Sequence, residues 1–169
     1  MVGANNLPGP AEEAGRLLER LGLWLGLAES CTGGLIAARI TGVPGSSAYF
    51  AGGVVAYANP VKERVLAVPA GELEGFGAVS REVAGSMAAG VKSLLGADIG
   101  LAVTGVAGPG GGTTAKPVGL VYVALEAPGR TTCRELRLRG SRAEIREATV
   151  AAALDLLLEY LREAEAEKT

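Results

Sequence analysis

The sequence contains no histidine, and this absence removes a whole class of mechanisms. No imidazole can act as a general base, so a serine or cysteine nucleophile needs a different partner. Cysteine is scarce as well, with only Cys31 and Cys133. Because zinc in proteins is held chiefly by histidine and cysteine, the composition predicts no zinc site. The two cysteines form no disulfide framework and no signal peptide is recognised, which together favour a cytoplasmic location.

Aromatic residues, long apolar runs and excess charge are also lacking. Aromatic residues make up only 4% of the chain, against 49% hydrophobic residues and 26 glycines, so we expect a core of small aliphatic side chains packed closely together. No apolar run reaches the roughly 18 residues of a membrane span, which predicts no membrane partner. With 16 basic and 18 acidic residues the formal charge is −2, which argues against nucleic acid as a partner.

Helices and strands alternate along the chain. The apolar periodicity predicts helices over 8–22, 32–41, 59–66, 81–95 and from 142 onward, with the tail after about Glu163 fraying in solvent. It predicts strands over 24–28, 49–57, 99–103, 118–125 and 132–138, the last two forming an antiparallel pair. We therefore predict an α/β fold, a three-layer α/β/α single domain with a mixed sheet, spanning 1–169 with its core at about 10–162.

Ser30 lies where the strand over 24–28 gives way to the next helix. In open α/β sheets ligands bind beyond the carboxyl ends of the strands, and both Ser30 and Thr104 are expected there. The backbone N–H groups that follow Ser30, from Cys31 to Gly34, are candidates to bind a ligand or a developing oxyanion. An alternative is open, because Ser30 or its neighbour Thr32 would also suit a helix cap.

Lys62 is the candidate base in a chain without histidine. A neutral lysine can activate a serine hydroxyl if burial or nearby positive charge lowers its pKa from about 10.4. Its neighbours Val61, Val65 and Leu66 are apolar, which is consistent with partial desolvation. Spacing alone does not bring Lys62 near Ser30, and an exposed lysine on a short helix is the open alternative.

A glycine-rich segment over 108–117 is a second candidate site. Successive N–H groups in such a loop can surround an anion, and Lys116 adds positive charge. The segment matches neither the phosphate-binding loop of nucleotide hydrolases nor the dinucleotide-binding fingerprint, so a flexible connection is equally compatible. Arg142 and Arg146 lie one turn apart, and they either hold a phosphate or pair with Glu144 and Glu147.

Five motifs in this order resemble the CinA C-terminal domain family, the nicotinamide-nucleotide amidohydrolases. The motifs are Ala28-Glu29-Ser30-Cys31-Thr32-Gly33-Gly34, Tyr57-Ala58-Asn59-Pro60-Val61-Lys62, Gly77-Ala78-Val79-Ser80, Thr104-Gly105-Val106-Ala107-Gly108-Pro109-Gly110-Gly111 and Lys116-Pro117-Val118-Gly119. The resemblance covers roughly residues 10–160. Many relatives carry an additional amino-terminal pyrophosphatase domain, for which a chain of 169 residues has no room, so we expect a stand-alone amidase.

The resemblance implies hydrolysis of nicotinamide mononucleotide to nicotinic acid mononucleotide and ammonia, without a cofactor or a metal. It implies that the catalytic residues are Ser30 as the nucleophile, Lys62 as its base and Tyr57 beside them. Either Lys62 or Tyr57 is then expected to donate a proton to the departing ammonia. Together with the glycine segments, it gives as candidate substrate-binding residues Cys31, Thr32, Gly33, Gly34, Asn59, Thr104, Gly105, Gly108, Gly110, Gly111, Lys116 and Arg142. It also implies a homo-oligomer, a dimer or larger.

Two other functions are open. The first is a cysteine amidase with Cys31 as its nucleophile, because a thiol at the start of a helix has a lowered pKa. The second is a module without enzymatic activity that only binds a nucleotide or a partner protein. The other cysteine, Cys133, is expected to pack in the core or on an edge strand.

Overall fold

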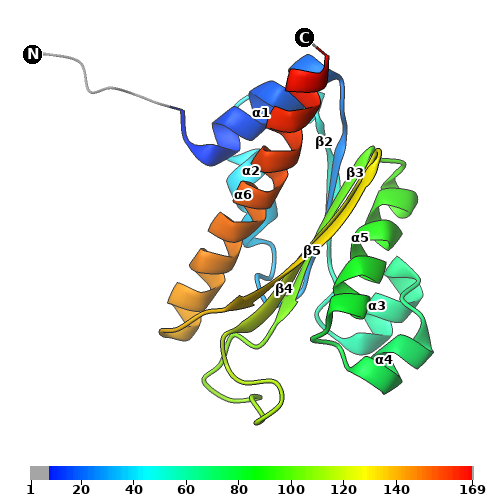
Figure 1. Ribbon diagram of the computed structural model, residues 1–169, viewed down its shortest axis with the longest axis vertical. Coiled ribbons are helices and arrows are strands. Elements are labelled where there is room, and N and C mark those ends of the chain that lie inside the picture. Colours follow the sequence, from blue (N-terminus) through cyan, green and yellow to red (C-terminus); the bar gives the residue numbers. More distant parts are fainter. Residues whose placement is uncertain (1–7, 169) are drawn as a thin grey trace, which may run out of the picture.

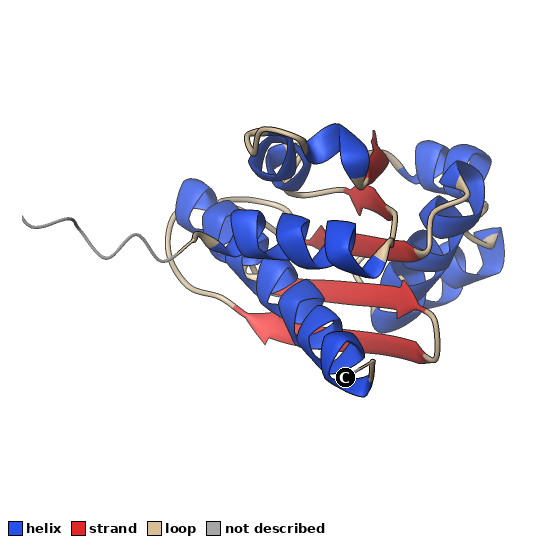
Figure 2. Ribbon diagram, turned by 90° about the horizontal axis from the view of Figure 1, so that it is seen from above, coloured by secondary structure: helices blue, strands red, loops and turns tan. Residues whose placement is uncertain are grey.

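The computed structural model describes residues 8–168, which form one five-stranded sheet with helices on both faces (Figures 1 and 2). The strands are β1 (Leu25–Glu29), β2 (Phe50–Val55), β3 (Ile99–Gly105), β4 (Leu120–Ala127) and β5 (Arg130–Arg137). The helices are α1 (Pro10–Leu21), α2 (Leu35–Thr41), the 3-10 turn η1 (Ser46–Ala48), α3 (Asn59–Leu66), α4 (Ala70–Phe76), α5 (Arg81–Leu95) and α6 (Arg142–Glu167). Residues 1–7 and Thr169 of the predicted domain lie outside the described residues.

The sheet is mixed, with the strand order β2-β1-β3-β4-β5. Strand β1 pairs in parallel with both β2 and β3, and β4 pairs antiparallel with both β3 and β5. Figure 1 shows α1, α2 and α6 on one face of the sheet and α3, α4 and α5 on the other. The predicted three-layer α/β/α fold with a mixed sheet, including the antiparallel pair, is confirmed.

Two local predictions are wrong, and one helix was not predicted. Helix α4 was not predicted, because residues 70–76 contain two glycines and little apolar periodicity. Helix α2 begins at Leu35 instead of 32, since residues 31–34 form a turn in which Gly33 and Gly34 have positive φ angles of 59° and 101°. Helix α6 continues to Glu167 instead of fraying after Glu163. Contacts with α1 hold this last part of α6, because Arg20 pairs with Glu165 and Lys168 donates to the Leu21 carbonyl.

Large and small side chains alternate along the central strands, so the two helical layers approach the sheet to different depths. On one face, packed with residues of α1, α2 and α6, lie Leu25, Leu27, Ile99, Leu101 and Val103. On the other face, under α5, lie Gly26, Ala28, Gly100 and Ala102. A Cβ at Gly100 would lie 2.0 Å from the Ala88 carbonyl oxygen of α5. The close packing over small residues that composition predicts therefore belongs mainly to the α5 face.

The tight packing of α5 extends to α3 through Gly90. A Cβ at Gly90 would lie 1.9 Å from the Leu66 carbonyl oxygen at the end of α3, so alanine there would force the two helices apart. We expect Gly90→Ala to lower the free energy of unfolding by about 1–3 kcal/mol. A matched control is Gly85→Ala in the same helix, where a Cβ meets nothing within 4 Å and where alanine should stabilise by up to about 1 kcal/mol. Urea unfolding measures both, and equal stabilities would contradict the close-contact argument.

Candidate active site

The carboxyl ends of the three parallel strands meet at one edge of the sheet, and the predicted catalytic residues gather there. Ser30 follows β1 and donates its N–H to the Val103 carbonyl at 3.1 Å, while Ala56 follows β2 and donates its N–H to the Glu29 carbonyl at 2.8 Å. Successive side chains of a strand point to opposite faces. Glu29 therefore points toward α2, and Ser30 points toward the face that α3 and α5 cover.

Lys62 reaches Ser30 from α3. Its Nζ lies 3.2 Å from the Ser30 Oγ, and it also contacts the carbonyl oxygens of Ala56 at 2.8 Å and Tyr57 at 3.0 Å. The Lys62 residue is 1% exposed and Ser30 is 8% exposed. The alternative of an exposed lysine is therefore wrong. The backbone that follows β2 supplies two of the three contacts, so β2 and the start of α3 together position this side chain.

The surroundings of Lys62 favour its neutral form. Burial lowers the pKa of Lys62 below its ordinary value of 10.5, and the nearby Cys31 acts weakly in the opposite direction. Among residues 8–168, no carboxylate lies within 4.0 Å of its Nζ. A neutral amine has two N–H donors and one lone pair. If the donors bind the two carbonyls, the lone pair is left for the Ser30 hydroxyl, which is the arrangement that a general base requires.

Glu29 occupies the start of α2, a role that the sequence analysis missed. Glu29 is only 1% exposed. Its carboxylate accepts hydrogen bonds from the N–H groups of Gly34 at 3.0 Å, Ile36 at 3.1 Å and Ala37 at 2.8 Å. A carboxylate at a helix N-terminus satisfies free N–H groups and the helix dipole. The N–H of Gly34 is therefore already bound by the protein. The strand alternation was the signal for this role, because the residue before Ser30 must point to the opposite face.

The remaining amides of the turn divide into bound and unbound groups. Gly33 donates its N–H to the Ser30 carbonyl at 3.1 Å, which closes the turn. The N–H of Thr32 has no oxygen partner within the described part of the chain, and that of Cys31 contacts only its own sulfur. The N-cap of α2 is Gly34, so neither Ser30 nor Thr32 caps this helix, and that alternative is wrong. The Thr32 hydroxyl is buried, and no group of residues 8–168 makes a hydrogen bond with it.

Arg142 connects Tyr57 to the glycine-rich segment. It is the first residue of α6, and it donates to the Gly108 carbonyl at 2.8 Å and to the Tyr57 hydroxyl at 2.9 Å. The Tyr57 residue is 58% exposed, so its hydroxyl end is open to solvent while its carbonyl contacts Lys62. These three predicted residues therefore lie together, and the Tyr57 backbone connects them to Lys62.

Arg146, which the sequence analysis considered only for phosphate binding or an ion pair, contacts the turn after Ser30. Its Nε donates to the Cys31 carbonyl at 3.1 Å and its Nη2 to the Thr32 carbonyl at 2.9 Å. The alternative that Arg142 and Arg146 pair with Glu144 and Glu147 is wrong. Glu144 instead accepts the Ser141 N–H in a capping box, and Glu147 pairs with Arg39 of α2.

The other predicted binding residues lie around this edge with different surroundings. Thr104 is buried, and its hydroxyl donates to the Ala78 carbonyl at 2.8 Å, which fixes the segment before α5. The Lys116 ammonium donates to the Phe76 carbonyl at the end of α4. Gly105 is half-buried, and Asn59, Gly110 and Gly111 are exposed. In Figure 1 the segment between β3 and β4 extends beyond the lower end of the sheet.

Cys31 is buried, and the pKa of its thiol is raised instead of lowered. Burial raises the pKa of its thiol to about 11. The expected lowering is wrong because α2 does not begin until Leu35 and because Cys31 packs into the apolar core. With this pKa, only about one thiol in 10⁴ is ionised near pH 7. Cys133 packs partly buried against the core on the edge strand β5, as expected.

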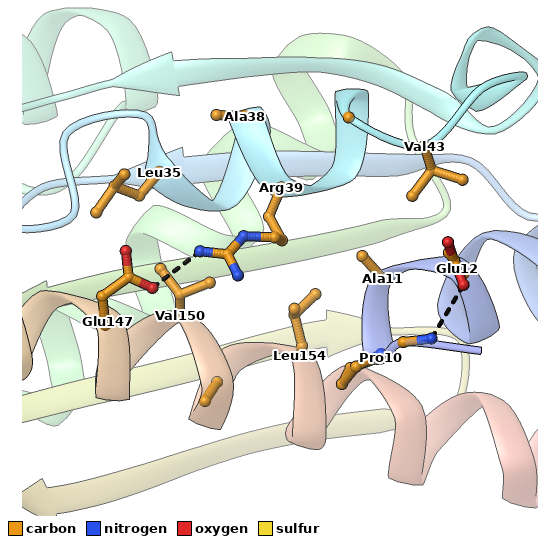
Figure 3. Close-up of a pocket in the computed structure, with 13 residues that line it drawn as sticks. Pro10, Ala11, Glu12, Leu35, Ala38, Arg39, Val43, Glu147, Val150 and Leu154 are labelled. Carbon is orange, nitrogen blue, oxygen red and sulfur yellow. Dashed lines mark hydrogen bonds and ion pairs between the residues drawn. The ribbon is translucent and has the colours of Figure 1, made fainter. Parts of the chain in front are cut away.

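A groove of about 530 Å³ lies between α1, α2 and α6, apart from Ser30 and Lys62 (Figure 3). Its apolar lining includes Leu35, Val43, Val150 and Leu154. Its charged side chains are already engaged, because Glu12 accepts the Gly9 N–H and Arg39 pairs with Glu147. The charged groups that line the groove therefore serve structural contacts, and the groove is separate from the site of Ser30 and Lys62.

Comparisons with known proteins agree on one family. The model of the CinA C-terminal domain matches residues 9–161. A putative competence-damage inducible protein of Desulforudis audaxviator is 54% identical over 152 residues, which are 90% of this chain and 37% of that protein. The chain thus spans little more than a third of the length of the curated relatives it matches.

Solved structures of similar length are also similar in fold. The competence/damage inducible protein CihA from Agrobacterium tumefaciens is 46% identical with a TM-score of 0.85, and the match covers 92% of this chain and 98% of that one. The competence damage-inducible protein A (ComA) from Klebsiella pneumoniae is 36% identical with a TM-score of 0.87, covering 90% and 95%. Within residues 8–168, no helix combines the length and hydrophobicity needed to cross a membrane. The same residues contain no group of three or more cysteine, aspartate or glutamate side chains suited to a metal ion.

Proposed function

The chain belongs to the CinA C-terminal domain family, and on that basis we propose that it hydrolyses the carboxamide of nicotinamide mononucleotide to nicotinic acid mononucleotide and ammonia. One observation carries the proposal. A lysine that pairs with no carboxylate of the described residues lies 3.2 Å from a serine hydroxyl at the carboxyl ends of the strands. Burial favours the neutral form of that lysine, which is the form able to accept a proton.

In the proposed mechanism, neutral Lys62 accepts the proton of Ser30 while Oγ forms a bond to the amide carbon. The electrons of the carbonyl double bond move to its oxygen. The N–H of Thr32 and that of Cys31, which contacts only its own sulfur, are the candidate donors to this oxyanion. Protonated Lys62 then returns the proton to the amide nitrogen as the C–N bond breaks and ammonia leaves. Water finally cleaves the acyl-enzyme, with Lys62 again as the base.

We assign nucleotide binding to the group formed by Tyr57, Arg142 and the glycine-rich segment. Arg142 is exposed at the start of α6 and lies within hydrogen-bond distance of both Tyr57 and Gly108. A guanidinium suits a phosphate because its donors match two phosphate oxygens. The cytoplasmic location and the homo-oligomeric state expected from the sequence stay predictions.

Substrate dependence tests the proposed function directly. We expect release of ammonia from nicotinamide mononucleotide, with kcat/KM at least about tenfold above that for the unphosphorylated riboside, because a charge-assisted contact contributes about 1.5–3 kcal/mol. An enzyme-coupled ammonia assay with both compounds measures this difference. Equal turnover of the two would contradict the phosphate site. Tight binding of the mononucleotide by calorimetry without turnover would favour the binding module instead.

A further inference from the structure

Arg146 holds the turn that follows Ser30 by two consecutive carbonyl oxygens. Its Nε donates to the Cys31 carbonyl at 3.1 Å and its Nη2 to the Thr32 carbonyl at 2.9 Å. A guanidinium is planar and rigid, so two donors on two adjacent carbonyls fix the orientation of both peptide groups. The side chain is half-buried, and it comes from α6, on the face of the sheet opposite to Lys62.

Peptide geometry transmits this orientation to the amides. In a planar trans peptide, the C=O and the N–H point in opposite directions. The Thr32 carbonyl is bound by Arg146, and the N–H of the same peptide, from Gly33, points away and donates to the Ser30 carbonyl at 3.1 Å. The preceding peptide follows the same rule, because its Cys31 carbonyl is also bound by Arg146. Its N–H, from Thr32, therefore points away from the Arg146 guanidinium.

We propose that Arg146 is a positioning residue that orients the Thr32 N–H toward the oxyanion formed when Ser30 attacks. The N–H of Thr32 is free for this role because no oxygen in the described part of the chain accepts it. Arg146 also places a positive charge on the carbonyl of the same peptide, which strengthens that N–H as a donor. The inference rests on the proposed role of Ser30 as a nucleophile, and it does not depend on the identity of the amide substrate.

If Arg146 had a purely structural role, its replacement would affect stability but not kcat. Arg39 provides the comparison, since it also links α2 to α6 by pairing with Glu147 but has no contact with the turn after Ser30. If Arg146 only joined helices, then Arg146→Met and Arg39→Met would both change stability and leave kcat unaltered. If Arg146 positions an oxyanion donor, then only its replacement lowers kcat.

The test compares Arg146→Lys, Arg146→Met and Arg39→Met with the unaltered chain. We expect both Arg146 variants to lower kcat by about 10–10³-fold, because they lose stabilisation of the transition state. KM should stay within about threefold of its original value, and the pH at which activity rises should not change. Lysine keeps the charge but cannot hold two carbonyls in one plane, so Arg146→Lys tests the geometry and is also the variant better able to fold. Added methylguanidine should partly restore the activity of Arg146→Met. Arg39→Met should keep its kcat.

A second readout does not require the natural substrate. A fluorophosphonate reacts with an activated serine, forming a bond between Oγ and phosphorus as the bond to fluorine breaks; fluoride leaves and the proton passes to Lys62. The phosphoryl oxygen then takes the position of the oxyanion. Intact-mass measurement should show that the rate of labelling at Ser30 falls by the same factor as kcat in both Arg146 variants. The labelling rate of Arg39→Met should not change.

The two readouts separate the inference from the proposed function. Slower labelling of the Arg146 variants supports the inference even if the mononucleotide proves not to be a substrate. Labelling and turnover of both Arg146 variants at the unaltered rate overturn the inference and leave the proposed function intact. An unaltered chain that neither labels at Ser30 nor releases ammonia overturns both.

Discussion

Replacing Ser30 with alanine is expected to lower kcat for ammonia release from nicotinamide mononucleotide by at least about 10³-fold. The substitution removes the nucleophile, and the remaining groups can only assist direct attack by water. Ser30 is small and 8% exposed, so the fold should tolerate alanine and the circular dichroism spectrum should not change. A variant that keeps more than about a tenth of the original rate would exclude Ser30 as the nucleophile.

Cys31→Ala is the matched control for Ser30→Ala. The two residues are adjacent, but the Cys31 thiol is buried and its pKa is raised to about 11, so it is protonated at neutral pH. We expect Cys31→Ala to keep kcat within about threefold, since a protonated thiol is a poor nucleophile. The opposite pattern, with activity lost in Cys31→Ala and kept in Ser30→Ala, would establish the cysteine amidase.

Lys62→Met should have the second-largest effect, a loss of about 10²–10⁴-fold in kcat, because among residues 8–168 no other side chain contacts the Ser30 hydroxyl to accept its proton. Lys62→Arg should be as inactive, since a guanidinium does not lose its proton in proteins. In the unaltered chain, kcat/KM should rise with pH through the folded-state pKa of Lys62, which lies below 10.5. Initial rates measured across this range check both expectations. Substantial activity in Lys62→Arg would show that Lys62 is not the base.

Lys62 also links stability to pH, and the sign follows from its lowered pKa. Between the folded-state pKa and about 10.4, the unfolded chain binds more protons than the folded one. The stability of the unaltered chain relative to Lys62→Met should therefore rise with pH in this window, by up to about 1.4 kcal/mol per pH unit, and should be constant at lower pH. Urea unfolding of both proteins at several pH values gives this difference. A difference that falls as the pH rises would contradict the buried, uncharged lysine.

The sequence predicted the layers of the fold better than its local turns. Helices α1 and α5 could be predicted from their apolar periodicity, and the start of α6 from the capping box of Ser141 and Glu144. Helix α4 escaped prediction because Gly71 and Gly75 weaken the helical pattern, and its position depends on packing against α5. The start of α2 was misplaced because Gly33 and Gly34 adopt positive φ, which a sequence pattern does not report.

The contact between Ser30 and Lys62 could be predicted only through the family resemblance. The two residues are 32 positions apart, and no periodicity relates a strand end to a helix that follows a different strand. They meet because β1 and β2 are parallel neighbours whose carboxyl ends lie together. The role of Glu29 was missed for another reason. The turn was treated as a row of free amides, although the Glu29 carboxylate, next to Ser30, binds one of them, the N–H of Gly34.

Because side chains alternate along β1, the face toward which Ser30 points depends on its position in the strand. Glu29 and Ser30 point to opposite helical layers, and which layer each one faces depends on the number of residues that separate it from Leu25. Deleting or inserting one residue between Leu25 and Glu29 would exchange the two side chains, turning a carboxylate toward Lys62 and an alcohol toward α2. A single-residue change of this kind would keep Ser30 in place only if a β-bulge absorbed it, as the register shift between Leu25 and Gly26 does where β1 pairs with β2.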